Sequence, residues 1–275
     1  MKTLSKKVVL KGIFPYLKLK DKNITWYKKI LIYFEIVIMS WMILWILLNL
    51  FYDIFFTYKY QYENLTFYTN QNIVANKIFD TILNDADIYL KAHNIELKNL
   101  NANIYILNNS FLYTSTMIPF SQIFLTNSDA YKLFNSIYFK YVDIDKNMVY
   151  ANSKKQYPSK FSIVLAHELV HIWQKNRLTY INFFMLPQWI KEGFPVYVSQ
   201  EFDKKIKDKK DFITWVQNNK NKSSMSDFCA LWGLMVKHAI EKMHKTVDEL
   251  HEGKVEYDEV LNSLLKEYNI TKEEK

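Results

Sequence analysis

The sequence predicts an α+β protein in which an N-terminal transmembrane helix precedes a small domain with a mixed sheet and then a mostly helical C-terminal half. Three observations support this class. Residues 30–52 are almost wholly apolar, residues 101–152 contain short β-rich runs, and residues 158–270 show apolar side chains at helical spacing. With 275 residues, of which 49% are hydrophobic, the chain is long enough to bury one substantial core.

The apolar run from Ile30 to Phe51 contains one charge, Glu35. About 20 apolar residues cross a bilayer core, so we expect a transmembrane signal anchor at residues 30–52. A buried core helix is the alternative. Residues 1–29 hold nine Lys and one Asp and therefore carry the whole formal net charge of +8. By the positive-inside rule this basic tail is cytoplasmic, and the remainder of a single-pass protein of the cell membrane is extracytoplasmic. A cleaved secretory signal is the rival interpretation.

Charge and cysteine content exclude other classes. Beyond residue 29 the chain has 27 basic and 27 acidic residues, so a nucleic-acid partner is not expected. The single Cys229 forms no intrachain disulfide, and the extracytoplasmic domain must be stable through its core alone.

After the anchor, residues 53–69 are expected to be a linker and residues 70–270 a single domain. We expect a long helix at residues 72–92 because its apolar side chains recur at helical spacing. Strands are expected at residues 103–107, 118–126 and 147–152. Helices should follow at residues 158–174, 188–202, 211–217, 226–243, 246–251 and 257–268.

The first of these C-terminal helices carries a metal-binding pattern. His167 and His171 are four residues apart, so they lie on one face of a helix and can bind one ion together. Zn²⁺ in a catalytic site takes three protein ligands and lowers the pKa of a water in the open position to about 7. Glu168 lies beside the two histidines, where it can act as general base on that water.

A third ligand should come from an element that packs across this helix. Glu192 fits, because it lies near the start of the apolar-patterned helix at residues 188–202. The alternative is an amphipathic helix that binds no metal. Burying two imidazoles and a carboxylate in an apolar stripe would then be costly.

The segments His167-Glu168-Leu169-Val170-His171 and Trp189-Ile190-Lys191-Glu192-Gly193-Phe194 resemble those of the gluzincin metallopeptidases, particularly small peptidase-MA-like domains with a Trp-x-x-Glu-Gly motif. The resemblance covers residues 101–268. It implies a zincin-like fold, with His167, His171 and Glu192 as zinc ligands and Glu168 as catalytic base.

Two positions depart from the pattern of this family. Pro195 follows the third ligand where the family usually has a small helix former, and it is expected to kink or delay that helix. Residues 226–238 lack the Tyr that related domains often carry near the metal. Tyr197 or His238 is the candidate oxyanion stabiliser, and packing is the alternative role for each.

Together these features predict a membrane-anchored zinc-dependent metallopeptidase acting on peptide or protein substrates. The resemblance makes residues 149–152 the candidate edge strand for binding an extended peptide, and an ordinary core strand is the alternative. Two other functions remain open: a non-catalytic, zinc-containing membrane-anchored binding module, and an amidase on a non-peptide substrate.

Overall fold

The computed structural model describes residues 26–50, 52–71, 77–107, 128–131, 135–139, 141–150, 158–201, 206, 208–218 and 223–270. It divides into two compact units, Met1–Ile54 and Phe55–Lys275, which we describe separately. The expected strand at residues 118–126 and the basic tail up to residue 25 lie outside the described residues.

The described residues of the first unit form one long helix, α2 (Trp26–Leu50), and most of the short 3₁₀ helix η1 (Tyr52–Phe55). Many apolar side chains of α2 are exposed, among them Ile30, Phe34 and Val37. Within the described part of the chain, no helix combines the length and apolarity that crossing a bilayer requires. The predicted transmembrane helix at residues 30–52 is therefore not supported by the structure.

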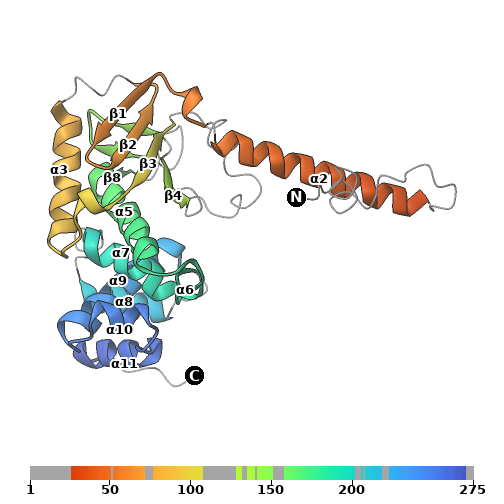
Figure 1. Cartoon of the computed structure of the whole chain (residues 1–275). Helices are drawn as coiled ribbons and strands as arrows, with labels where there is room; N and C mark the ends of the chain where they lie inside the picture. The colour runs from red at the N-terminus through yellow and green to blue at the C-terminus, as the bar shows by residue number, and fades with distance from the viewer. Residues whose placement is uncertain are drawn as a thin grey trace, which may run out of the picture. The chain divides into compact units, whose positions relative to one another are not determined.

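The second unit begins with a five-stranded mixed sheet (Figure 1). Its strand order is β1-β2-β3-β5-β4, in which β2, β3 and β5 run parallel and the outer strands β1 and β4 are antiparallel to their neighbours. The strands are β1 (Tyr58–Tyr62), β2 (Leu65–Thr69), β3 (Ala102–Ile106), β4 (Ser128–Tyr131) and β5 (Ser136–Phe139). Residues 58–69, expected as linker, thus form the β1–β2 hairpin, whose turn places Glu63 at φ 54°.

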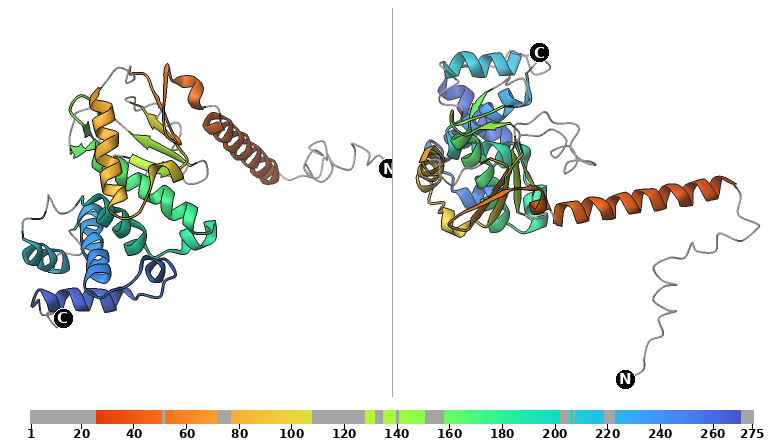
Figure 2. Two further views of the ribbon diagram at one scale, coloured as in Figure 1. Left: turned by 60° about the vertical axis from the view of Figure 1, so that its left-hand side comes forward. Right: turned by 90° about the horizontal axis from the view of Figure 1, so that it is seen from above.

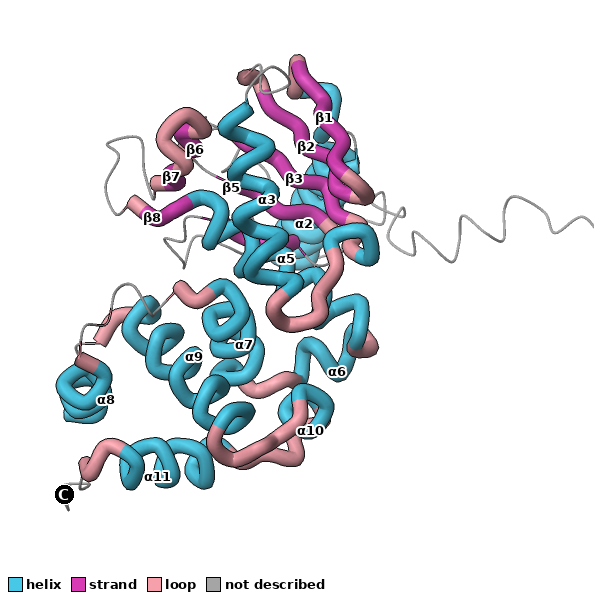
Figure 3. The backbone as a smooth tube through the Cα atoms, turned by 90° about the vertical axis from the view of Figure 1, so that its left-hand side faces the viewer, coloured by secondary structure: helices cyan, strands magenta, loops and turns pink. Residues whose placement is uncertain are grey.

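Two helices cover one face of this sheet, α3 (Lys77–Lys91) and α5 (Phe161–Arg177), as Figure 3 shows. Successive strand residues point to opposite faces. On the helix-covered face, Phe67 of β2 packs edge-on against Phe79 of α3, with ring centroids 5.1 Å apart. Phe139 of β5 packs in the same way on Phe161 of α5 at 4.9 Å. This layer fixes α5 against the sheet.

On the opposite face, three tyrosines that are direct partners in the strand register stack in a row. Tyr68, Tyr105 and Tyr138 lie on β2, β3 and β5, with successive ring centroids 4.9 and 5.0 Å apart. Offset or stacked aromatic pairs of this kind contribute about 0.5–1.5 kcal/mol beyond their area burial. The row therefore reinforces the parallel pairing of the three central strands.

A small second sheet contains β6 (Val142–Asp143), β7 (Met148–Val149) and β8 (Ser159–Lys160). β7 pairs with β6 on one side and with β8 on the other. Residues 149–152 were the candidate edge strand; this is wrong for Val149, because both sides of its strand are already paired, and residues 151–152 lie outside the described residues. Val149 is fully buried, so the alternative of an ordinary core strand holds.

The rest of the second unit is helical, as predicted, and lies beyond the sheet in Figures 1 and 2. A one-turn 3₁₀ helix, η2 (Leu97–Asn99), precedes β3. The helices after α5 are α6 (Tyr180–Met185), α7 (Gln188–Ser199), α8 (Lys209–Asn218), α9 (Met225–Glu241), α10 (Val247–His251) and α11 (Tyr257–Glu267). Capping boxes begin α9 at Ser224 and α10 at Thr246, which satisfies amide groups that the first helical turn leaves unpaired.

Candidate metal centre

The start of α5 is fixed by a residue of the β6–β7 turn. The Asn147 side-chain oxygen accepts a hydrogen bond from the Ser162 N–H at 2.9 Å, and the Asn147 carbonyl accepts one from the Phe161 N–H at 2.9 Å. These contacts satisfy two amides that have no partner within the helix. The helix is then held by its fully buried side chains Phe161, Leu165, Leu169 and Ile172, which sets the orientation of its polar residues.

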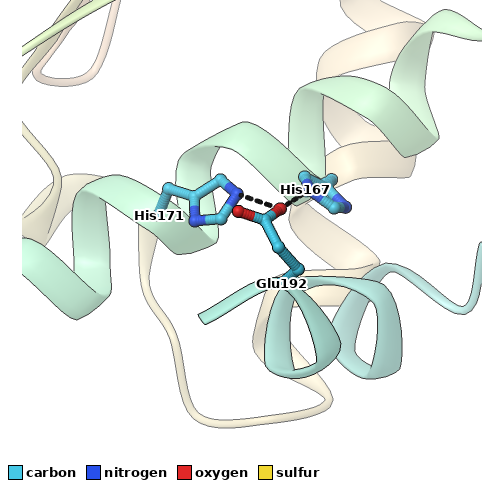
Figure 4. Close-up of side chains that lie close together, drawn as sticks. All are labelled: His167, His171 and Glu192. Atoms are coloured by element: carbon cyan, nitrogen blue, oxygen red, sulfur yellow. Dashed lines mark ion pairs between the residues drawn. The ribbon is translucent and has the colours of Figure 1, made fainter. Parts of the chain in front are cut away.

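The two motif histidines of α5 lie on one face, with ring centroids 5.0 Å apart. Glu192 of α7 projects between them (Figure 4). Its Oε2 lies 3.4 Å from Nε2 of His171 and 3.8 Å from Nε2 of His167. The three ligand atoms all lie within 4.8 Å of one another, and these residues form the one such cluster in the described part of the chain.

These separations fit a zinc ion. Zn–N and Zn–O bonds of about 2.0–2.2 Å in tetrahedral geometry place neighbouring ligand atoms roughly 3.3–3.5 Å apart. The observed 3.4 and 3.8 Å are close to that value. Two imidazoles and one carboxylate are also a common donor set of catalytic zinc sites, in which three protein ligands leave one position open. His167, His171 and Glu192 could therefore hold zinc with small adjustments.

The electrostatics of the cluster favour positive charge. Burial lowers the pKa of His167, but the carboxylates of Glu192 and Glu201, with the charge of Glu168, outweigh it and raise that pKa to about 10. Burial raises the pKa of Glu192, but His171 and His167 together hold it well below its ordinary value. A divalent cation bound to neutral imidazoles supplies the positive charge that these carboxylates favour.

The predicted base, Glu168, follows His167 on α5 and is 6% exposed. Its charge contributes to raising the pKa of His167, which places the carboxylate close to the cluster. On a helix, a residue one position further is rotated by about 100°, so Glu168 flanks the two histidines and does not lie between them.

Pro195 lies inside α7. The helix begins at Gln188, as expected from the sequence, and runs through Pro195 to Ser199, so the proline does not delay its start. Glu192 consequently lies in the second turn of a formed helix. The adjacent Gly193 lets α7 approach α9 closely, because a Cβ at this position would lie 2.6 Å from the carbonyl oxygen of Trp232.

The two candidate oxyanion stabilisers have other contacts. The Tyr197 hydroxyl donates to Oε1 of Glu241 at 3.4 Å, and burial, with the charge of Glu241, raises the pKa of Tyr197 to about 12. His238 has Glu267 Oε2 2.6 Å from Nδ1 and Ser263 Oγ 2.8 Å from Nε2. Neither residue belongs to the three-residue cluster, and these contacts are typical of packing residues.

Two residues near the cluster were not predicted from the sequence. Oε2 of Glu201 lies 3.5 Å from Nδ1 of His167. Cys229 of α9 is close enough for Glu192 and Glu201 to act on it: burial, with these two charges, raises its pKa to about 12, so it is a neutral thiol. Glu201 lies just beyond α7, and no periodic pattern in the sequence points to it.

A mixed sheet followed by helices that place two histidines and a glutamate around one point defines a zinc-dependent metallopeptidase domain of the gluzincin type. Residues 130–263 match the family model described as the peptidase family M1 domain, which is a gluzincin family. The chain thus carries a zinc metallopeptidase domain, and the predictions of enzyme class and of zinc as cofactor are confirmed. A search of curated proteins found no match.

Proposed function

We propose that this protein hydrolyses peptide bonds of peptide or protein substrates, with His167, His171 and Glu192 as zinc ligands and Glu168 as general base. The observation that carries the proposal is the convergence of three ligand atoms, from two helices, within 4.8 Å of one another. Zinc held there would polarise the scissile carbonyl and lower the pKa of the attacking water.

The chain's own groups supply the proton transfers and the environment. The Glu168 carboxylate accepts a proton from the attacking water and delivers it to the leaving nitrogen. Its low exposure, 6%, matched by 6% for His171, restricts bulk water around the reacting groups. Low water access strengthens the electrostatic interactions on which the proton transfer depends.

Replacement of Glu168 by Gln tests the assignment. Glu168→Gln keeps the shape of the side chain but removes the base, so we expect retained zinc and a loss of hydrolysis of about 10²–10⁴-fold. Glu192→Gln is the matched variant, since it also exchanges a carboxylate for an amide but should lose zinc. Zinc content by mass spectrometry and cleavage of a mixed peptide library measure the two effects. Wild-type activity of Glu168→Gln would contradict the proposal.

The same assays separate the two alternative functions. A binding module with structural zinc would retain zinc but cleave no substrate even as the wild-type protein. An amidase would leave the peptide library intact and cleave non-peptide amides, with the same sensitivity to Glu168→Gln.

We further propose that the N-terminal region holds the enzyme at the cell membrane, with the N-terminus cytoplasmic and the catalytic domain extracytoplasmic. Support comes from the apolar run of residues 30–51 beside a tail that carries +8, and from the exposure of Ile30, Phe34 and Val37 on α2, at 54%, 61% and 64%. The test is carbonate extraction of membranes combined with protease treatment of intact cells. Release by carbonate, or protection of the C-terminal domain from protease, would contradict this localisation.

A further inference from the structure

The two ligand histidines differ in what faces the nitrogen that points away from the cluster. Nε2 of each ring faces Glu192. Nδ1 of His167 is buried, and Glu201 Oε2 is the acceptor that faces it, at 3.5 Å. This separation is at the outer limit of a hydrogen bond, and among the described residues neither Nδ1 of His167 nor Nδ1 of His171 has a hydrogen-bond partner; the difference is that Nδ1 of His167 has this carboxylate beside it.

Glu201 reaches His167 because of the way α7 ends. Gln200 adopts the left-handed conformation, with φ 54° and ψ 31°. Its N–H donates to the Tyr197 carbonyl at 3.3 Å, and the Glu201 N–H donates to the Val196 carbonyl at 3.3 Å. This turn closes the helix. The helix α7 and its C-terminal turn thereby supply both carboxylates that face His167. Glu192 lies near the N-terminal end of the helix, and Glu201 lies just after its C-terminal end.

The contact between Glu201 and His167 acts through the proton of the imidazole. A histidine that binds a metal through Nε2 carries its remaining proton on Nδ1. A buried N–H without an acceptor costs about 1–3 kcal/mol, whereas a carboxylate acceptor makes a charge-assisted hydrogen bond. Such a partner fixes the tautomer and orientation of the ring and increases its basicity as a ligand.

We propose that Glu201 is a positioning residue for the metal centre, which accepts the Nδ1 proton of His167 and thereby raises the affinity for zinc. The inference rests on the proposed ligand set. It assigns no contact between Glu201 and the substrate. The αL turn at Gln200 is part of the same arrangement, because it ends α7 directly before residue 201, whose carboxylate faces His167.

The test compares Glu201→Gln and Glu201→Ala with a control of the same type elsewhere in the fold. Oε2 of Glu267 lies 2.6 Å from Nδ1 of His238, which is buried and outside the three-residue cluster. Glu267→Gln therefore also replaces a carboxylate that faces a buried imidazole by a neutral amide. Zinc dissociation constants are measured by chelator competition, and the visible spectrum of the Co²⁺-loaded protein reports ligand geometry. Thermal unfolding of the metal-free proteins reports folding.

We expect Glu201→Ala to raise the zinc dissociation constant about 10–100-fold and to change the Co²⁺ spectrum. Glu201→Gln should have a smaller effect in the same direction, because its amide oxygen still accepts a hydrogen bond; it carries the test if the Ala variant does not fold. Glu267→Gln should leave the zinc affinity unchanged. Unchanged zinc affinity in both Glu201 variants, or an equal loss in Glu267→Gln, would overturn the inference.

Two ligand variants separate this inference from the proposed function. If His171→Ala and Glu192→Ala lower zinc affinity while the Glu201 variants do not, the positioning role alone fails. If His171→Ala and Glu192→Ala leave zinc affinity unchanged, the ligand set itself is wrong.

Discussion

Gly193 allows a quantitative test of how α7 is held beside the metal centre. It follows the ligand Glu192, and a Cβ added to it would lie 2.6 Å from the carbonyl oxygen, 2.8 Å from the carbonyl carbon and 3.0 Å from the Cβ of Trp232 on α9. Ordinary contacts begin at 3.4 Å, so Gly193→Ala requires the two helices to separate by about 0.8 Å. The carbonyl group of Trp232 is part of the backbone and its Cβ is attached directly to the backbone, so neither can rotate away.

Two effects of this substitution have opposite signs. Ala is a better helix former than Gly by about 1 kcal/mol, which would stabilise α7. Overpacking of a tight interface costs typically about 1–3 kcal/mol, and a clash between backbones lies at the upper end of that range. We therefore expect a net loss of about 2 kcal/mol in the free energy of unfolding, together with weaker zinc binding because Glu192 moves with α7.

Urea unfolding of the metal-free protein measures the first effect, and chelator competition measures the second. Gly253→Ala is a matched control. Gly253 has φ +69°, and a Cβ there would meet no atom within 4 Å, so this variant should lose about 1 kcal/mol from backbone strain and keep its zinc affinity. A Gly193→Ala protein as stable as wild type, with unchanged zinc affinity, would refute the close-packing argument.

Two further predictions concern stability. Burial, with the charge of Arg177 adding to it, lowers the pKa of His251 to about 4, so the unfolded chain binds this proton more readily than the folded one. The free energy of unfolding is therefore unaffected by this histidine above pH 6.5, and it falls by about 3 kcal/mol as the pH decreases to 4. Urea unfolding of His251→Gln should show a shallower dependence of this free energy on pH over that interval. An identical slope in the variant and the wild type would contradict the assignment. Ser224 caps α9 by accepting from the Asp227 N–H at 3.3 Å, so Ser224→Ala should lower the free energy of unfolding by about 1 kcal/mol, and an unchanged urea midpoint would show that the cap contributes little.

The ligand cluster could be predicted because its information is local. The four-residue spacing of His167 and His171 places both rings on one helical face in any fold, and the apolar pattern around Glu192 predicts the helix that carries it. The other C-terminal helices lie within three residues of their expected bounds for the same reason, since their apolar periodicity lies within each segment, whereas the six-residue α6 was not predicted.

Other features depend on tertiary structure or on weak local signals. Glu201 approaches His167 through a left-handed turn at Gln200, a residue type that gives no sign of that conformation. Residues 58–69 were expected to be part of a linker, but they form the strands β1 (YKYQY) and β2 (LTFYT). Alternate tyrosines in β1 were the available signal, and Phe79 of α3, which packs on Tyr60 and Phe67, gives them a partner.

The short sequence distance between the zinc ligands has a consequence for folding. His167 and His171 of α5 are separated from Glu192 of α7 only by the short helix α6, whereas the parallel pairing of β2 with β3 joins Leu65 to Ala102 across the longer helix α3. Contacts close in sequence form faster than distant ones, because shorter loops lose less entropy on closure. Docking of α7 on α5 therefore closes a shorter loop than the pairing of β2 with β3, so the ligand cluster can form without waiting for the parallel strands to pair.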